Sequence, residues 1–293
     1  MNMDAVNLVY FSPTHTTQRL LEGIAQGMGV STVTPIDLTP PHAPHQRIEI
    51  DQVTLTLIGA PVHSGRLPKV AVERLYRVQG NNTPAVLVVV YGNRAFEDAL
   101  LELKDVTMAR GFIPIAGAAF IGEHSYSTAA LPIAAGRPDA ADMEKAIAFG
   151  QQIRQKLAQT PLDNLPPPTI PGNFPYKERR PSTETPPTPI TIADLCTLCG
   201  DCATVCPTAA ITVSDAVITQ AAACIQCCAC TRACPTGARV MEDPRILRTA
   251  AWLYEEHSAR HEPEIFLEGV IYGYQEPRCG EYPQPLHPRD PSH

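Results

Sequence analysis

The sequence lacks the features of several common protein classes. No stretch approaches the roughly 18 consecutive apolar residues that a membrane helix needs. The first residues, from Met1 to Val6, have neither the basic region nor the apolar region of a secretion signal. We therefore expect a soluble, cytoplasmic protein with no membrane span.

The motifs of several enzyme and nucleic-acid-binding classes are absent as well. No GxGxxG opens a helix, which argues against an NAD(P)-binding domain, and no nucleophile and base form a catalytic pattern. The 23 basic and 30 acidic residues give a net charge of −7. This acidic balance and the lack of a DNA-binding motif argue against nucleic acid and favour partners with basic surfaces.

Against these absences, one cysteine pattern is prominent. The pattern CxxCxxCxxxCP occurs twice, and each cysteine of the second run lies 28 residues after its counterpart in the first. The first run comprises Cys196, Cys199, Cys202 and Cys206 before Pro207, and the second comprises Cys224, Cys227, Cys230 and Cys234 before Pro235. This spacing predicts a duplicated half-domain with a pseudo-twofold axis.

The spacing also bears on which metal the cysteines bind. Three thiolates on a tight turn can hold three irons of a cubane, while the fourth iron takes a more distant sulfur. One alternative is a zinc module with two separated ligand pairs around one tetrahedral ion, and another is a disulfide framework. Two complete runs exceed what zinc needs, and adjacent CxxC turns make poor bridges. The pattern therefore favours iron–sulfur clusters.

This segment resembles the bacterial-type ferredoxins, which carry two 4Fe-4S clusters. In those proteins the fourth cysteine of each run ligates the other cluster. The resemblance implies cluster I on Cys196, Cys199, Cys202 and Cys234, and cluster II on Cys224, Cys227, Cys230 and Cys206. Of the two remaining cysteines, we expect Cys228 to pack beside a cluster, with a ligand swap as the alternative, and Cys279 to be an unpaired thiol.

The N-terminal half alternates apolar strands with helical segments. We predict strands over 5–11, 53–59, 85–91 and 112–120, and helices over 18–28, 68–78, 96–110 and 140–158. Near-continuous apolar strands are typical of a parallel sheet that is covered on both faces. The alternation predicts a doubly wound α/β domain whose ligand binds at the carboxyl ends of the strands.

A turn rich in hydroxyl groups, Ser12-Pro13-Thr14-His15-Thr16-Thr17, follows the first predicted strand. A strand, a turn and a helix N-terminus together form an anion site, because backbone N–H groups and the helix dipole face the anion. We expect a phosphate here, and the alternative is a simple helix N-cap.

This domain resembles the flavodoxins, whose first loop cradles the phosphate of FMN. The resemblance implies a sheet of order 2-1-3-4-5 and FMN contacts from Ser12, Thr14, His15, Thr16 and Thr17. Flavodoxins usually have glycine where this chain has His15, so either the loop differs or the imidazole contributes to the phosphate site. The alternative is a flavodoxin-shaped domain that has lost its flavin.

The same resemblance implies that two further loops lie along the flavin ring. These loops contribute Pro61, Val62, His63, Ser64 and Gly65 on one side, and Gly92, Asn93 and Arg94 on the other. His63 or Arg66 is a candidate for tuning the flavin, and a solvated loop histidine is the equal alternative for His63. Three roles are open for Tyr126: it could cover the flavin, help close the interface with the ferredoxin domain, or simply pack in the fold.

The composition then divides the chain into parts. Ten prolines among residues 160–193 predict an extended, semi-rigid tether. We expect a flavodoxin-like domain over 1–160, a Pro-rich linker over 161–193, a small α+β ferredoxin domain over 194–243, and a C-terminal helix and extended tail over 244–293. In that last part we expect Asp243-Pro244 to begin a helix with an apolar face, with Trp252 off that face. We expect residues 264–275 to dock on another part of the protein and residues 283–293 to be disordered.

This order of domains resembles the flavodoxin–ferredoxin fusion proteins over about residues 3–243. The resemblance implies electron transfer among FMN, two 4Fe-4S clusters and external redox partner proteins, because clusters pass single electrons and a flavin can hold one or two. Two alternatives stay open. One is an oxidoreductase that acts on a small molecule at the flavin edge, and the other is a flavin-free ferredoxin with a docking domain.

Overall fold

The N-terminal part of the protein is built on a mainly parallel sheet. The computed structural model describes residues 2–43, 46–179 and 185–267. Its parallel strands are β1 (Asn2–Tyr10), β2 (Thr32–Asp37), β4 (Thr54–Pro61), β6 (Thr83–Tyr91) and β7 (Phe112–Ile121). They are arranged β7-β6-β4-β1-β2, so that, counted along the chain, their order is the predicted 2-1-3-4-5. The α/β fold is therefore flavodoxin-like.

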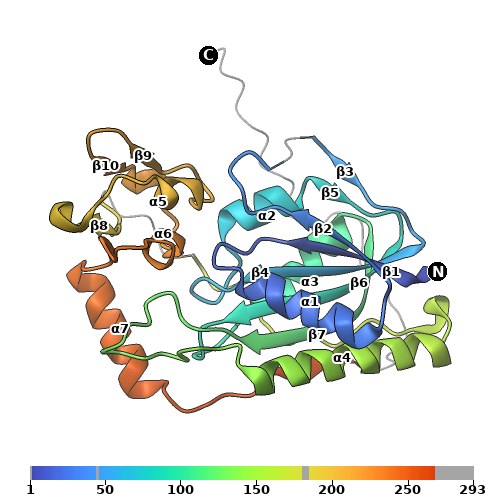
Figure 1. Cartoon of the computed structure of the whole chain (residues 1–293). Helices are drawn as coiled ribbons and strands as arrows, with labels where there is room; N and C mark the ends of the chain where they lie inside the picture. Colours follow the sequence, from blue (N-terminus) through green and yellow to red (C-terminus); the bar gives the residue numbers. More distant parts are fainter. Residues whose placement is uncertain (1, 44–45, 180–184, 268–293) are drawn as a thin grey trace.

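Helices cover both faces of this sheet (Figure 1). They are α1 (Thr16–Met28) and α4 (Ala140–Gln159) on one face, and α2 (Lys69–Leu75) and α3 (Ala99–Ala109) on the other. Every residue of β6 is buried, because the strand lies between two apolar cores. The sandwiched sheet is the rigid base on which the loops at its carboxyl end are held.

Local chemistry explains where the helices begin and end. Helix α1 ends at Gly29, whose φ of 64° is the left-handed conformation that glycine adopts readily. Helix α4 begins with a capping box, in which Asp139 and Asp142 each accept a backbone N–H from the other. The two helices cross closely, since a Cβ at Gly150 would lie 2.0 Å from the carbonyl oxygen of Ile24.

The short strand β2 is a difference from the sequence prediction. Its residues, TVTPID, are mostly exposed and include a proline, so they lack the apolar run that predicts a buried strand. A proline, which has no backbone N–H to donate, is tolerated there because β2 is an edge strand and pairs with a neighbour on one side only. Another unpredicted pair, β3 (Ile48–Glu49) and β5 (Val78–Gln79), is also short and parallel.

The described part of the proline-rich segment is extended, but it is anchored to the α/β domain. Ile170 lies in the core with an exposed fraction of 9%. The carboxylate of Asp98, at the start of α3, accepts the backbone N–H groups of Asn173 at 2.8 Å and Lys177 at 2.6 Å. The ring of Tyr176 lies 4.4 Å from the guanidinium carbon of Arg66. Residues up to 179 therefore belong to the surface of the domain, and they are less free than a tether.

The cysteine-rich segment forms a small α+β unit of short elements. They are β8 (Ile190–Thr191), η2 (Ala193–Leu195), α5 (Asp201–Thr204), β9 (Ile211–Val213), β10 (Val217–Thr219), η3 (Ala221–Ala223), α6 (Ala229–Arg232) and β11 (Arg239–Val240). Strand β9 pairs with β10, and β8 pairs with β11, both antiparallel.

After this unit the chain returns to the α/β domain. Helix α7 (Pro244–Glu256) begins at Asp243 as predicted and packs Ala250 and Leu253 against Ile133. The predicted apolar face comprises Ile246, Leu247, Ala250, Leu253 and Tyr254, of which Leu247 and Tyr254 are exposed. Trp252 is also exposed, and it contacts the ring edge of His257.

Beyond α7, β12 (Glu264–Phe266) adds an antiparallel strand to the edge of β7. The predicted docking of 264–275 is thus observed for its first residues. The remainder of that stretch, Cys279 and residues 283–293 lie outside the described residues. Among the described residues, no helix is long and apolar enough to cross a membrane.

Candidate functional site

The two cysteine runs fold into equivalent local structures. Leu198 and Gln226, which are 28 residues apart, have φ values of 55° and 58°. Gly200 and Cys228 are likewise equivalent, and they precede α5 and α6 with φ values of 87° and 56°. Cys228 therefore occupies the position that Gly200 holds before the helix of the first run.

One hollow is lined by cysteines from both runs. Cys196, Cys199 and Cys202 of the first run line it together with Cys234 of the second. Its volume is ≈ 290 Å³ when its open part is included. Cys199 is exposed, so this hollow opens to solvent. We call it the outer hollow.

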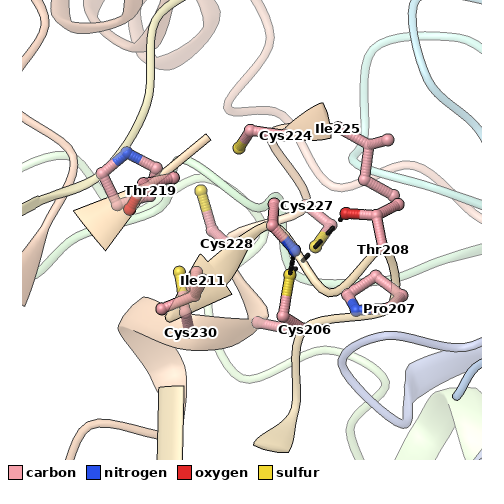
Figure 2. A pocket seen from close by; sticks show the side chains of 13 residues that line it. Cys206, Pro207, Thr208, Ile211, Thr219, Cys224, Ile225, Cys227, Cys228 and Cys230 are labelled. Carbon is pink, nitrogen blue, oxygen red and sulfur yellow. Dashed lines mark hydrogen bonds between the residues drawn. The ribbon is translucent and has the colours of Figure 1, made fainter. Parts of the chain in front are cut away.

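A second hollow of ≈ 340 Å³ has the reciprocal composition (Figure 2). Cys224, Cys227 and Cys230 of the second run line it together with Cys206 of the first. Cys228 and Ile211 also line it, and the N–H of Ala210 donates to the Cys206 sulfur at 3.2 Å. We call it the inner hollow, because its margin contacts the α/β domain, as described below.

The donor sets of both hollows suit 4Fe-4S clusters. Each contains the four cysteines that the sequence predicts for one cluster, and in each the fourth comes from the other run, as in bacterial-type ferredoxins. Among the described residues, no three side chains of His, Cys, Asp or Glu converge as they would around one metal ion. The sulfurs surround a volume, which is the arrangement that a cubane requires.

Most of the thiols are shielded from water. Burial raises the pKa of Cys227 to about 12 and also raises the pKa values of Cys202, Cys224 and Cys230. Cys234 differs: its partial burial raises the pKa, but hydrogen bonds, first among them the one from the Arg239 backbone, lower it on balance. Cluster ligation at these cysteines would therefore have to displace the protons that the buried thiols otherwise keep.

The predicted phosphate loop has a defined shape. His15 adopts φ 59° and ψ 1°, a left-handed conformation that glycine adopts more readily than histidine. The hydroxyl of Ser12 accepts the N–H of Gln18 at 3.1 Å. The hydroxyl oxygens of Thr14 and Thr16 lie 3.3 Å apart.

Accessibility differs among the hydroxyl side chains of this loop. Thr14 and Thr16 are half-buried, whereas Ser12 and Thr17 are buried. The methyl group of Thr17 packs on Gly59, where a Cβ would lie only 2.7 Å from it. The first-turn N–H groups of a helix have no partner within the helix. The loop therefore presents donors at the N-terminus of α1, a suitable environment for a phosphate.

The first predicted ring loop closes in a tight turn. His63 and Arg66 exchange backbone hydrogen bonds of 2.8 and 3.1 Å, and Ser64 and Gly65 between them both have positive φ. Before the turn, Pro61 and Val62 are half-buried, and the N–H of Val62 donates to the carbonyl of Val90. The turn thus continues the end of β4.

Arg66, a sequence candidate for tuning the flavin, is engaged elsewhere. Its guanidinium donates to both carboxylate oxygens of Glu102, at 2.9 and 2.8 Å, and to the carbonyl of Lys177. Arg179 contacts the same carboxylate at 2.7 Å. These contacts anchor the proline-rich segment on α3. The positive charge of Arg66 is therefore already paired with Glu102.

The second ring loop is held by the C-terminal segment. Asn93 is buried, and its side-chain N–H₂ donates to the carbonyls of His257 and Ala259 at 2.6 and 2.8 Å. Arg94 forms an ion pair with Glu97. A Cβ at Gly92 would lie 2.3 Å from the ring of His124. The Oδ1 atom of Asn93 is buried and has no partner among the described residues, so a donor from a ligand would satisfy it.

Two neutral histidines lie in these sheet-end loops. Burial lowers the pKa of His63 to about 4, assisted by the positive charge of Arg179. Burial also lowers the pKa of His124 to about 4. The Nδ1 atom of His124 accepts the N–H of Tyr126 at 3.0 Å, which fixes its ring proton on Nε2.

The inner hollow is joined to the α/β domain on one side by loop 123–126. The hydroxyl of Tyr126 lies 3.3 Å from Oε1 of Gln226, the residue before Cys227. Arg232 of α6 donates to the carbonyl of His124 at 3.0 Å and pairs with Glu123 at 3.4 Å. Tyr126 therefore closes an interface between the two parts of the chain.

A second junction runs through the buried Arg74. Its guanidinium donates to the carbonyl of Pro207, directly after Cys206, at 2.6 Å, and to the carbonyl of Thr39 at 2.6 Å. The hydroxyl of Thr39 in turn accepts the N–H of Ser12 at 2.7 Å. A continuous polar path therefore connects the predicted phosphate loop with the margin of the inner hollow.

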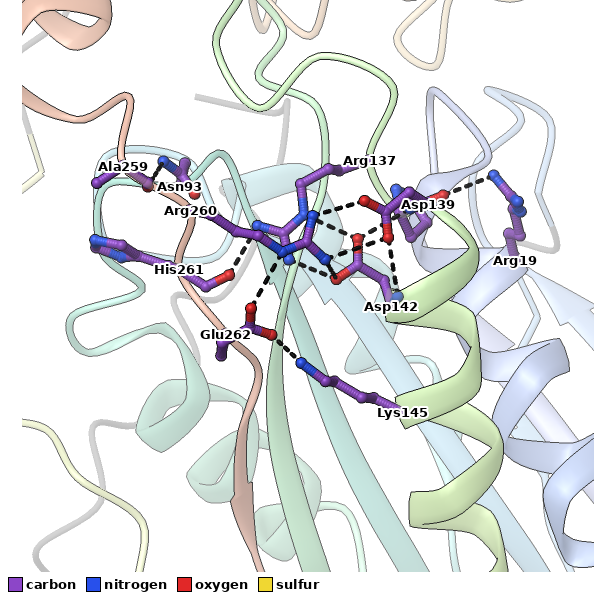
Figure 3. A network of polar contacts seen from close by, with 11 residues as sticks. Arg19, Asn93, Arg137, Asp139, Asp142, Lys145, Ala259, Arg260, His261 and Glu262 are labelled. Atoms are coloured by element: carbon purple, nitrogen blue, oxygen red, sulfur yellow. Dashed lines mark hydrogen bonds and ion pairs between the residues drawn. The ribbon is translucent and has the colours of Figure 1, made fainter.

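The returning C-terminal segment completes this arrangement (Figure 3). Arg260 donates to Asp139 at 2.6 Å, and Glu262 pairs with Lys145. Arg137 forms a buried ion pair with Asp142 and donates to the carbonyl of His261. Sequence reasoning missed these residues because they form no motif, and every contact except the one between Arg137 and Asp142 joins residues more than 100 positions apart.

Comparison with known proteins gives one family match. Residues 189–212 match the family model described as 4Fe-4S binding domain, which covers the first cysteine run. Comparison with the curated proteins gives no match.

Solved structures resemble the N-terminal half. A flavodoxin from the domain Archaea is 12% identical with a TM-score of 0.34, covering 53% of this chain and 99% of the other. Flavodoxin 2 from Bacillus cereus is 13% identical with a TM-score of 0.38, covering 52% and 99%. Rubredoxin oxygen:oxidoreductase from Desulfovibrio gigas is 16% identical with a TM-score of 0.38, covering 53% and 36%. The strand order, and not these distant similarities, carries the fold assignment.

The chain combines a flavodoxin-like fold with a 4Fe-4S binding domain. The 4Fe-4S segment supports a role in electron transfer.

Proposed function

We propose that the chain relays electrons between FMN, two 4Fe-4S clusters and external redox partner proteins. Clusters pass single electrons, and a flavin holds one or two, so such a chain would couple one-electron and two-electron chemistry. In this proposal FMN binds at the loops of Ser12–Thr17, Pro61–Gly65 and Gly92–Arg94, cluster I occupies the outer hollow, and cluster II occupies the inner hollow.

The observation that carries the proposal is the pairing of cysteines from different runs. The outer hollow takes Cys234 from the second run, and the inner hollow takes Cys206 from the first. This exchange is characteristic of ferredoxins with two clusters, whereas a single-cluster fold has no use for it. It supports two clusters per chain.

The junctions with the α/β domain support transfer inside one molecule. Tyr126, in a sheet-end loop, contacts Gln226, and Arg74, in α2, donates to the carbonyl of Pro207, so that both join the α/β domain to the margin of the inner hollow. Cluster II would therefore exchange electrons with the flavin. The chain is also anchored on both sides of the cysteine-rich unit, which keeps the two parts at a high effective concentration.

External partners would meet cluster I. The outer hollow is bordered by Leu198, and both Leu198 and the nearby Leu195 are exposed, by 42% and 47%. Cys199 beside them is exposed as well. The net charge of −7 suits a partner with a basic surface. We place this carrier in the cytoplasm, where cysteine thiols stay reduced.

The first test is the composition of protein that is prepared without oxygen. We expect about eight irons and eight sulfides per chain, from two four-iron cubanes, with one FMN. Bound zinc with little acid-labile sulfide would contradict the cluster assignment. Iron and sulfide without flavin would leave a ferredoxin with a docking domain.

A second test asks whether the cofactors communicate within the chain. After rapid one-electron reduction of the clusters, we expect reduced flavin to appear at a rate that does not depend on protein concentration. The matched control is a mixture of separately produced chains, in which one carries Cys206→Ser and the other carries an FMN-site substitution. A rate that rises with concentration in the parent protein would contradict an internal relay.

A further inference from the structure

The two halves of the cysteine-rich unit differ at one buried position. The 28-residue repeat makes Ile211 the counterpart of Arg239, since both lie five residues after the fourth cysteine of their run. Ile211 lines the inner hollow, and Arg239 lines the outer hollow. The pseudo-twofold symmetry therefore exchanges an isoleucine for a cation.

Arg239 is held between the two hollows. Its exposed fraction is 4%. One terminal nitrogen donates to the hydroxyl of Thr191 at 2.7 Å, and the other donates to the hydroxyl of Thr219 at 2.9 Å. The second nitrogen also lies 3.9 Å from the sulfur of Cys230, a cysteine of the inner hollow. The guanidinium of Arg239 thus contacts a cysteine of the inner hollow, while the same side chain lines the outer hollow.

No carboxylate among the described residues forms an ion pair with Arg239. Its partners are two neutral hydroxyls and a thiol sulfur, and its Nε is buried with no hydrogen-bond acceptor among the described residues. A buried charge without a counter-charge is strongly unfavourable, so a protein that retains one normally supplies the opposite charge nearby. Negative groups in the two hollows would supply it.

The proposed clusters have the required charge. A cubane core of charge +2 with four thiolates carries −2, and one-electron reduction makes it −3. A nearby fixed cation stabilises the more negative state, and hydrogen bonds to ligand sulfurs act in the same direction, so both raise the reduction potential.

We infer that Arg239 is the shared counter-ion of the two clusters and raises their reduction potentials. This inference rests on the proposed function, because it requires both hollows to hold clusters. Arg239 is a positioning residue, which acts on the potentials through charge and hydrogen bonds. Ile211, at the equivalent position, provides no such charge, so this pair of equivalent positions supplies one cation for the two clusters.

The test compares neutral and charged substitutions in the full chain. Arg239→Gln removes the charge but keeps a polar side chain for the threonines, and Arg239→Lys keeps the charge. Arg248→Gln is the matched control, because it removes one positive charge from an exposed position of α7. Iron and sulfide are determined first, and the potentials are then measured by redox titration followed by electron paramagnetic resonance.

For Arg239→Gln we expect the equilibrium for reduction of at least one cluster to become tenfold less favourable, a fall of about 59 mV for a one-electron couple. Arg239→Lys should lie closer to the parent protein, and Arg248→Gln should match it. Unchanged potentials in Arg239→Gln with full cluster content would overturn the inference. An equal fall in Arg248→Gln would do the same.

Cluster content decides the remaining outcomes. If Arg239→Gln loses its clusters while Arg239→Lys keeps them, the charge itself is needed to hold the clusters, which supports the inference. If both variants lose them, the shape of the guanidinium matters and the counter-ion role is wrong. A parent protein without iron and sulfide would instead contradict the proposed function, so the two failures are distinguishable.

Discussion

The hydroxyl of Tyr126 lies 3.3 Å from Oε1 of Gln226, and this contact joins the loop after β7 to the turn between Cys224 and Cys227. It brings the carboxyl end of the sheet against the inner hollow. In a protein that transfers electrons internally, such a contact keeps the distance between the cofactors constant.

We therefore expect Tyr126→Phe to slow electron transfer between cluster II and the flavin. One hydrogen bond contributes about 1 kcal/mol, roughly a factor of five in the population of the docked arrangement. The rate of flavin reduction after rapid cluster reduction should fall by up to that factor. The control is Tyr254→Phe, at an exposed position of α7. Equal rates in the parent protein and Tyr126→Phe would show that this contact does not control transfer.

The exchange of cysteines between runs predicts which cluster each substitution damages. Cys206→Ser should disrupt cluster II and largely spare cluster I, so that iron falls from about eight toward about four per chain. Cys228→Ser is the matched control, because Cys228 takes the place of the capping glycine and should leave the iron content unchanged. Iron analysis and paramagnetic resonance of the reduced protein distinguish the clusters. A fall toward about four irons per chain in the Cys228 variant would support the ligand swap instead.

The phosphate loop can be tested by removing hydroxyl donors without changing side-chain shape. Thr14→Val and Thr17→Val each remove a donor to a charged acceptor, a contribution of about 1.5 to 3 kcal/mol. The double variant should bind FMN at least tenfold more weakly, since about 1.4 kcal/mol corresponds to a factor of ten. Thr249→Val in α7, where the hydroxyl donates to the carbonyl of Arg245, is the control. Unchanged FMN affinity in a fluorescence titration would place the phosphate elsewhere.

The half-buried His124 predicts a loss of stability in acid. Burial lowers the pKa of His124 from 6.5 to about 4, so between these values the unfolded chain binds a proton that the folded chain does not. The free energy of unfolding should fall as the pH drops through this window, and above it His124 should have no effect.

His124→Asn provides the comparison, because the amide oxygen can still accept the N–H of Tyr126. The thermal unfolding midpoint of this variant should fall less steeply between pH 6.5 and 4 than that of the parent protein. His42→Asn, at an exposed position, is the control. Parallel curves for the parent protein and His124→Asn would contradict the assigned pKa.

The local parts of the fold were predictable from the sequence. The run AVLVVVY lies in the fully buried strand β6, and Asp243-Pro244 opens α7 as predicted. The spacing of 28 residues also predicted the equivalence seen at Gly200 and Cys228. These features follow from short-range rules on hydrophobic pattern, helix capping and repetition.

The long-range contacts were not predictable in the same way. Asn93 was assigned to a ring loop, but nothing in its neighbourhood indicated that it would hold the backbone of His257. Arg66 was a candidate for flavin tuning because of its position, whereas its pairing with Glu102 depends on how β4 and α3 meet. Proline content predicted an extended segment correctly, but the anchoring of Ile170 in the core requires the surface that receives it.

The strand β12 has a consequence for how the chain is synthesised. It covers the outer edge of β7, and an uncovered edge strand is a template for pairing with other chains. Residues 264–266 are made about 140 residues after β7, so a nascent α/β domain emerges from the ribosome with that edge open. Until the cysteine-rich unit has also been made, the domain is exposed to aggregation. Cells that make a fragment ending before residue 264 should therefore accumulate it in inclusion bodies, while the longer chain stays dispersed.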